Sequence, residues 1–386
     1  MQSRTKIIGY DELYLFSLRL YLVRFLFLGY VNWIEQLEGI VNSIGRSIYI
    51  INIVAFVALL LFSERTSIIW YILVALFSIC MLLSYNNSGN MELLFTTLFA
   101  LFSKDISQKK LFSAFWNTCI IIFVCCLIVF FLGLSTNRSV AFGYGIGHSL
   151  GMTHPNALAA FVLSLLLSWE IIRNQMRLNI RMLVVFTLAG VTTWLITLSR
   201  TFLYLVIIFP VMLTFINLTR SLKTERVLTL VRFGVLIMLI GSYYYMTNAS
   251  MQTNLGDSGF RFRFAYPYRI FLTYGLHPFG ISYSAVSALY ANSVDSSYLY
   301  MLIFCGYIPT GIMIALIIWI CRRCYKEGLF SLLAVISVYV LQGITEQYMI
   351  RIAFNCAYLL TLSEFDLFQN DSSSLIDGIE CQDVIS

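Results

Sequence analysis

Residues 248–297 read NASMQTNLGDSGFRFRFAYPYRIFLTYGLHPFGISYSAVSALYANSVDSS and are the one long polar stretch in an otherwise apolar chain. The stretch contains three arginines, a histidine and an aspartate next to its last two residues: Arg261, Arg263, Arg269, His277 and Asp295. Apolar segments flank it on both sides, so it must lie at a membrane surface. An arginine-rich connection between membrane spans is suited to holding an anionic ligand. A structural interpretation competes with this one, because a long loop needs polar residues to stay solvated.

The composition is that of a membrane protein. Of the 386 residues, 59% are hydrophobic and 11% are charged, whereas soluble domains carry about 25% charged residues. Apolar runs such as residues 51–62 and 120–133 are continuous and do not alternate with polar residues as barrel strands do. We therefore predict an all-α, polytopic integral membrane protein. Residues 1–14 lack the pattern of a signal peptide, so the first span is expected to stay in the mature protein.

Apolar runs of about 17 to 23 residues, with some shorter, predict about twelve transmembrane helices. They are 13–30, 47–62, 67–84, 91–102, 113–133, 155–172, 182–198, 202–218, 233–247, 298–320, 329–345 and 352–368. The first run contains Arg19 and Arg24 and also fits an interfacial helix, and the fourth also fits a re-entrant segment. Residues 1–368 are thus predicted to form a single transmembrane domain, and the polar tail 369–386 is predicted to be disordered and cytoplasmic.

Lysine and arginine in the connections predict the orientation, because such residues favour the cytoplasmic side. Under the span list above, four basic connections share that side: 104–110, 173–181, 220–232 and 322–326. The loop 248–297 is then extracytoplasmic. The outer side also holds seven arginines, which run against the orientation bias and ask for a reason: Arg46, Arg138, Arg200, Arg261, Arg263, Arg269 and Arg351.

Four further pieces accompany the loop on the outer side. A glycine-rich connection, 135–153, leads into His154, and the short turn 199–201 carries Arg200. A third turn holds Glu346 with Arg351, where Glu346 is suited to pair with an arginine. The fourth is Asp295, just before a predicted span, where it fits either an N-terminal helix cap or a general base. All three histidines of the chain, His148, His154 and His277, fall on this side.

Several chemistries have no signature in the chain. It shows no Ser-His-Asp order, zinc-ligand spacing or P-loop. Cys321 and Cys324 form a lone C-x-x-C without partner ligands, so neither a metal nor a cofactor is expected. Nucleotide-linked substrates belong to the cytoplasm. An anionic substrate on the outer side is therefore expected to be a lipid-linked phosphate or pyrophosphate.

The outer segments resemble the O-antigen polymerase (Wzy-like) and O-antigen ligase superfamily over roughly residues 90–365. Residues 148–161, HSLGMTHPNALAAF, resemble the R/H-x-x-G-x-x-H-P-N entry of capsule and exopolysaccharide polymerases. Residues 199–201 resemble the S-R-T/A turn of the superfamily. Residues 344–346 and 353–355 resemble the closing part of the polymerases.

Two longer spacings belong to the same resemblance. Arg269, ten residues and Gly280 fit the R-x10-G pattern of polymerase loops. Asp295, Ser296, nine residues and Gly306 follow the ligase-like H-[NSQ]-x9-G pattern, with aspartate in place of histidine. Pro309 also stands where that pattern has Gly, Thr or Tyr. Both departures favour a polymerase over a ligase.

The resemblance implies an enzyme of the bacterial cytoplasmic membrane with a GT-C type fold and a long extracytoplasmic loop. Such an enzyme joins oligosaccharide repeat units carried on undecaprenyl pyrophosphate and uses no nucleotide sugar. It implies Asp295 as the catalytic base, with His277 second. Binding of pyrophosphate and sugar is assigned to Arg200, Arg261, Arg263, Arg269, His154, Glu346 and Arg351. Expected partners are the lipid-linked oligosaccharide, membrane lipid, a chain-length regulator and a flippase, and no nucleic acid.

Two alternatives stay open. One is an O-antigen-ligase-like transferase. The other is a transporter, such as a flippase for lipid-linked oligosaccharides, which is expected to show internal repeats and polar sites at mid-membrane depth. No convincing internal sequence repeat is present. Arg19 and Arg24 lie inside an apolar run, however, so the transporter hypothesis stays open.

Overall fold

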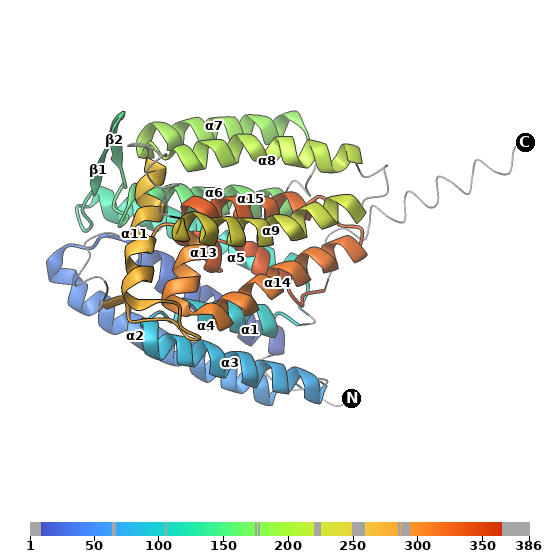
Figure 1. The fold of residues 1–386 in the computed structure, drawn as a ribbon. Helices are drawn as coiled ribbons and strands as arrows, with labels where there is room; N and C mark the ends of the chain where they lie inside the picture. The colour runs from blue at the N-terminus through green and yellow to red at the C-terminus, as the bar shows by residue number, and fades with distance from the viewer. Residues whose placement is uncertain are drawn as a thin grey trace, which may run out of the picture.

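The computed structural model describes residues 9–63, 67–104, 106–173, 176, 178–219, 225–248, 259–284, 286 and 294–364. Over these ranges the chain is a bundle of helices with one two-stranded hairpin (Figure 1), so the predicted helical class is confirmed. The first half contains α1 (Tyr10–Leu22), the π-helix η1 (Val23–Leu28), α2 (Glu35–Leu61), α3 (Ile68–Ser88), α4 (Glu92–Phe102), α5 (Gln108–Phe131), β1 (Ser139–Phe142), β2 (Gly145–His148), α6 (Pro155–Arg173) and α7 (Ile180–Thr197).

The second half contains α8 (Arg200–Thr219), α9 (Glu225–Thr247), α11 (Gly259–Tyr274), α13 (Ser297–Tyr300), the π-helix η3 (Met301–Cys305), α14 (Tyr307–Lys326) and α15 (Leu332–Thr345). Two 3-10 turns close the described chain, η4 (Gln347–Ile350) and η5 (Cys356–Leu360). Polar side chains begin several helices. Ser107 accepts a hydrogen bond from the Lys110 amide, and Asn179 accepts one from the Met182 amide, which satisfies amides that a helix start leaves open.

Seven helices in the described part are long and apolar enough to cross a membrane: α2, α3, α5, α6, α7, α8 and α14. This agrees with a multi-pass membrane protein. α6 lies at the centre, where it packs against α5, α7 and α8. In each of the other six, no more than half of the apolar window is buried inside the bundle, as expected of helices that meet lipid.

Two predicted spans differ from continuous transmembrane helices. α4 has 11 residues, so it rises about 16 Å, well short of the roughly 30 Å hydrocarbon core. Residues 352–364, the described part of the last predicted span, form turns and η5. Residues 351–360 are all buried, and an irregular backbone is tolerated at membrane depth when protein surrounds it. Their apolar character therefore reflects burial in the bundle.

The predicted span 298–320 is interrupted at Gly306, where η3 ends and α14 begins. Gly306 has φ of 95°, a conformation that side-chain-bearing residues rarely adopt. A Cβ at Gly306 would collide with Pro278 and Gly280, and a Cβ at Gly280 would collide with Phe304. Gly280 ends the R-x10-G pattern and Gly306 ends the ligase-like pattern, and the backbones of these two glycines are in contact. This contact joins the segment after α11 to the break before α14.

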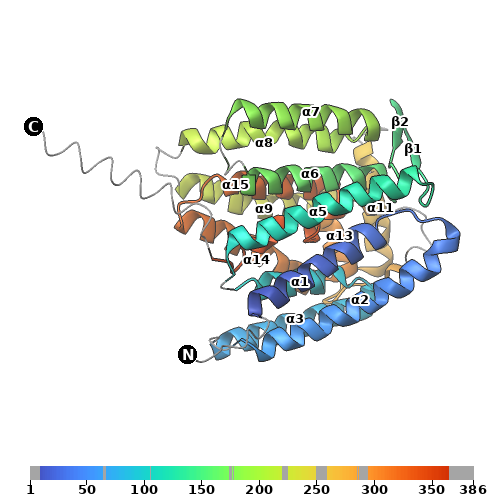
Figure 2. The same ribbon diagram turned by 180° about the vertical axis from the view of Figure 1, so that it is seen from behind.

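The predicted loop 248–297 contains a helix. α11 includes Pro267 and runs steeply across one end of the bundle, in contact with α9 (Figure 1). The β1–β2 hairpin lies at the same end (Figures 1 and 2), which we call the hairpin end. The glycine-rich connection 135–153, expected as a loop, supplies this hairpin, with Val140 opposite Gly147.

Basic residues of α5 and α14 lie at the opposite end of the bundle, which we call the basic end. At this end α5 begins with two lysines, and α14 finishes with two arginines and a lysine (Figure 2). Lys110 forms a salt bridge with Asp11 of α1 over 2.7 Å. Arg323 donates to the carbonyl oxygens of Leu360, Thr361 and Ser363 at 2.8–3.1 Å, which fixes the irregular last segment to α14. The lysines at the start of α5 and the basic residues at the end of α14 thus lie at one end of the bundle.

Candidate functional site

A polar cavity of about 550 Å³ lies toward the hairpin end, where α3 and α15 end and α4 begins. Its charged side chains are three arginines and one carboxylate, contributed by η1, α2, the segment after η4, and α4. The rest of the wall is mostly tyrosine, amide and hydroxyl groups. The described lining residues are Arg24, Arg46, Tyr49, Tyr85, Ser88, Gly89, Asn90, Met91, Glu92, Tyr283, Tyr300, Gln347 and Arg351.

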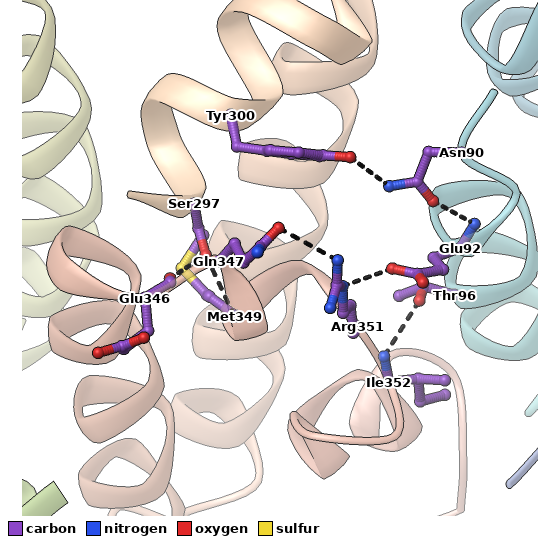
Figure 3. Close-up of polar contacts among 10 residues, drawn as sticks. All are labelled: Asn90, Glu92, Thr96, Ser297, Tyr300, Glu346, Gln347, Met349, Arg351 and Ile352. Carbon is purple, nitrogen blue, oxygen red and sulfur yellow. Dashed lines mark hydrogen bonds and ion pairs between the residues drawn. The ribbon is translucent and has the colours of Figure 1, made fainter. Parts of the chain in front are cut away.

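Arg351 is the most enclosed cation of this cavity, with 6% of its surface exposed. Its Nη2 donates to Gln347 Oε1 over 3.2 Å, and its Nε forms an ion pair with Glu92 Oε2 (Figure 3). Burial lowers the pKa of Arg351 to about 10, so the side chain keeps its charge at neutral pH. Its Nη1 is buried and has no hydrogen-bond partner among the described residues. A buried donor of this kind is costly unless a ligand satisfies it.

Arg24 approaches the cavity from η1, inside the first apolar run. Its guanidinium lies 4.6 Å from the centroid of the Tyr49 ring, and its buried Nε has no hydrogen-bond partner in the described chain. Two glycines make room for it. A Cβ at Gly45 would lie 2.5 Å from Arg24 Nε, and one at Gly29 would lie 2.9 Å from Arg24 Nη1. Glycine at these two positions therefore leaves the space that the Arg24 side chain occupies.

Valine at Gly45 is expected to displace Arg24 and to lower the free energy of unfolding by about 1–3 kcal/mol, the usual cost of overpacking. Gly39 provides a matched control, because it lies in the same helix and a Cβ there meets nothing within 4 Å. Gly39→Val carries the same change in helix propensity without the collision. Chemical unfolding of both variants in detergent measures the difference. Equal stability of the two would show that Arg24 does not need the space at Gly45.

A hydrogen-bonded network anchors the α4 side of the cavity (Figure 3). The Asn90 side-chain amide donates to the Tyr300 hydroxyl over 2.8 Å, and the Glu92 amide donates to Asn90 Oδ1 over 2.8 Å. One turn further, Thr96 Oγ1 accepts from the Ile352 amide over 3.1 Å. Glu92 and the Arg351 segment are thus held together by more than their ion pair.

A second polar group lies around Glu346, next to the chain that carries Arg351. Glu346 is buried, and its Oε1 accepts from the Asn156 side chain of α6 over 3.0 Å. Its carbonyl oxygen accepts from Ser297 Oγ over 2.6 Å, and Ser297 Oγ accepts from the Met349 amide over 3.2 Å (Figure 3). The starts of α6 and α13 therefore meet at the end of α15.

His154 and Asp295 belong to the same neighbourhood, since the charge of Asp295 acts on the His154 ring. Burial lowers the pKa of His154, the Arg138 charge lowers it further, and Asp295 raises it. His154 Nδ1 accepts from the Asn156 amide over 3.1 Å, which requires an unprotonated Nδ1. The residue before α13 is Ser296, so Asp295 is not the N-cap of that helix.

Loss of stability below about pH 6.5 is expected from His154. Above its ordinary pKa of 6.5 the ring is neutral in the folded and unfolded chain alike. As the pH falls through 6.5, the unfolded chain takes up the proton first, so stability declines until the lower folded pKa is passed. Melting temperatures between pH 7.5 and 5.5 should fall less steeply for His154→Asn. The exposed His148→Asn is the control, and equal slopes in all three proteins would contradict the assignment.

The remaining predicted residues lie away from the buried cations. Arg200 is exposed at the start of α8, with its guanidinium 3.6 Å from the centroid of the Tyr144 ring of the hairpin. Arg269 is exposed on α11, and His277 is exposed after it. His277 Nε2 is 2.7 Å from the Tyr274 carbonyl oxygen, to which it donates, so only Nδ1 is left to accept a proton.

The structure describes only the backbone of Arg261 and Arg263, which lie in the first turn and a half of α11. Their side chains are outside the described part.

The structure brings together some of the predicted residues and adds others. His154, Asp295 and Glu346 share one neighbourhood, and Arg351 lines the adjoining cavity. Sequence reasoning missed Glu92, and it gave Arg24 and Arg46 no role in the site. The signal for Arg24 and Glu92 was a charge within or at the edge of an apolar run, which marks a functional candidate in a membrane protein.

Comparison of the chain with protein-family models, with curated proteins and with solved structures gave no match.

Proposed function

We propose that this chain is a polysaccharide polymerase. It joins oligosaccharide repeat units carried on undecaprenyl pyrophosphate at the outer face of the bacterial cytoplasmic membrane, with an architecture of the GT-C type. The observation that carries the proposal is the cavity lined by Arg24, Arg46 and Arg351, with buried guanidinium nitrogens that have no hydrogen-bond partner among the residues that the structure describes. Arginine presents a planar, permanently charged fork that suits phosphate oxygens.

The chemistry of the proposed reaction requires a site for the leaving group. The bond between the anomeric carbon and the phosphate oxygen breaks, and the electron pair remains on the pyrophosphate. Positive groups fixed in a partly enclosed cavity stabilise this developing charge, and they do so more strongly than in water. Arg351 Nη1 and Arg24 Nε are the two buried donors placed for that role.

The attacking sugar hydroxyl needs a proton acceptor. Asp295 is assigned this role, because it lies near His154 and Glu346 at the hairpin end and does not serve as the N-cap of α13. His154 and Glu346, the latter fixed by Asn156, are assigned to holding the acceptor sugar. His277 Nδ1 remains the second candidate base.

The exposed arginines are assigned to the approach of the substrate. Arg200, at the start of α8 beside the hairpin, and Arg269 on α11 lie at the same end as the cavity, where the lipid-linked oligosaccharide enters in this proposal. A chain-length regulator and a flippase of the same pathway are the expected protein partners.

One observation favours a transporter as the second candidate. The α13–η3–α14 segment is a helix broken at Gly306, and transporters place substrate sites at broken helices. A flippase for lipid-linked oligosaccharides would use the same cationic cavity but would form no glycosidic bond.

Purified protein in liposomes, supplied only with a lipid-linked repeat unit, separates the two candidates. The polymerase forms products of two or more repeat units and releases undecaprenyl pyrophosphate, as read by mass spectrometry. Movement of intact substrate between leaflets without new glycosidic bonds would overturn the polymerase in favour of the flippase.

A further inference from the structure

Glu92 is the acidic side chain among the charged residues described around the cavity, against Arg24, Arg46 and Arg351. Its ionised carboxylate leaves the cavity with two net positive charges, and its protonated form leaves three. Because Glu92 Oε2 pairs with Arg351 Nε, an anion bound between Arg24 and Arg351 lies close to this carboxylate. In a partly enclosed site, charges at such short range interact far more strongly than in water.

Substrate and product of the proposed reaction differ by one charge. A diphosphate that links a lipid to a sugar is a diester and carries two negative charges. When the anomeric C–O bond breaks, the released lipid diphosphate keeps the electron pair and becomes a monoester. Its terminal phosphate then loses its last proton near pH 6, as phosphate monoesters do, which gives a third negative charge.

Resting on the proposed function, we propose that Glu92, in its ionised form, makes the cavity selective for the diphosphate diester and promotes release of the diphosphate monoester. Two positive charges match the diester, and the Glu92 carboxylate repels the extra charge of the product. Without Glu92, the three arginines would hold the product more tightly than the substrate. Glu92 is thus a specificity-determining residue of the site.

The charge of Glu92 can also be changed by pH, which provides a second test besides mutation. Burial raises the pKa of Glu92 to about 8, and the charge of Arg24 opposes this rise. Glu92 is therefore ionised at pH 9 and protonated at pH 6.5. The charged groups facing it are Arg24 of η1 and Arg351. The other titratable groups that interact with it are neutral phenols and a thiol, namely Tyr21, Tyr49, Tyr300 and Cys305.

The test is titration calorimetry of detergent-solubilised protein with two probes, geranyl diphosphate and its P2-methyl diester. Glu92→Gln should raise the affinity for the monoester at least about tenfold at pH 9 and the affinity for the diester clearly less. Glu92→Asp keeps the charge and should behave like the original protein. Glu38→Gln, an exposed carboxylate on α2, controls for the change in net charge. At pH 6.5 the original protein and Glu92→Gln should converge.

The outcomes separate this inference from the function beneath it. Unchanged monoester affinity in Glu92→Gln, or equal tightening toward both probes, would overturn the role of Glu92 while leaving the diphosphate site in place. A purely structural role of Glu92 would alter stability but would not produce convergence at pH 6.5. Failure of the original protein to bind either probe would overturn the diphosphate site itself.

Discussion

Arg351→Ala is expected to reduce polymer formation at least about 100-fold, the usual loss when a donor that stabilises a developing negative charge is removed. Arg351 is the most enclosed cation of the cavity, and its Nη1 is a buried donor with no hydrogen-bond partner in the described part of the chain. Arg351→Lys is expected to be nearly as inactive, because lysine keeps the charge but loses the planar fork. The measurement is turnover of a lipid-linked repeat unit in membranes at matched protein amounts.

Stability must be separated from chemistry in this series. Arg351→Ala leaves the partly buried Glu92 without its partner, which is expected to lower the melting temperature. The double variant Arg351→Met with Glu92→Gln removes both charges and should recover much of the melting temperature. If activity returned together with stability in the double variant, Arg351 would be only a structural half of an ion pair.

Asp295→Asn is expected to lower the polymerisation rate about 100-fold or more, because an amide cannot accept the proton of the attacking hydroxyl. Folding should be preserved, since the substitution is nearly isosteric and Ser296, not Asp295, occupies the N-cap of α13. Loss of the Asp295 charge should also lower the pKa of His154 further. The rate of the variant is measured against pH, beside Glu38→Gln as a carboxylate control.

Near-normal polymer from Asp295→Asn would remove Asp295 from the mechanism and leave His277 Nδ1 as the base. A charge-only role for Asp295 makes a different forecast. In that case the residual rate would keep the pH dependence of the original protein, whereas removal of the base would change that dependence.

The helices could be predicted from the sequence because continuous apolar runs allow few structures in a membrane. The predicted spans 113–133, 155–172 and 182–198 agree closely with the bounds of α5, α6 and α7. The same rule was wrong for residues 352–364, since hydropathy does not distinguish lipid contact from burial inside the protein. Three Arg323 hydrogen bonds hold that segment as turns, and such long-range contacts leave no local pattern.

The site could be predicted in part. Outward placement singled out Arg351 and Glu346, and short spacings singled out His154 and Asp295. The pairing of Arg351 with Glu92 joins positions that lie far apart in the chain, so periodicity could not reveal it. Arg24 was visible as a charge in an apolar run, but its meaning depended on the space left by Gly45 on a different helix. Gly280 and Gly306 were noted as ends of spacings, and only the fold shows that they touch.

In the proposed mechanism, the cationic cavity holds the diphosphate of a lipid-linked repeat unit. An electron cryomicroscopy structure in nanodiscs, with an analogue whose anomeric C–O–P linkage is replaced by a phosphonate, tests it most directly. We expect diphosphate density within hydrogen-bond reach of Arg351 Nη1 and Arg24 Nε, with the sugar directed toward Asp295. Diphosphate density at Arg200 or along α11, with the cavity occupied only by water, would contradict it.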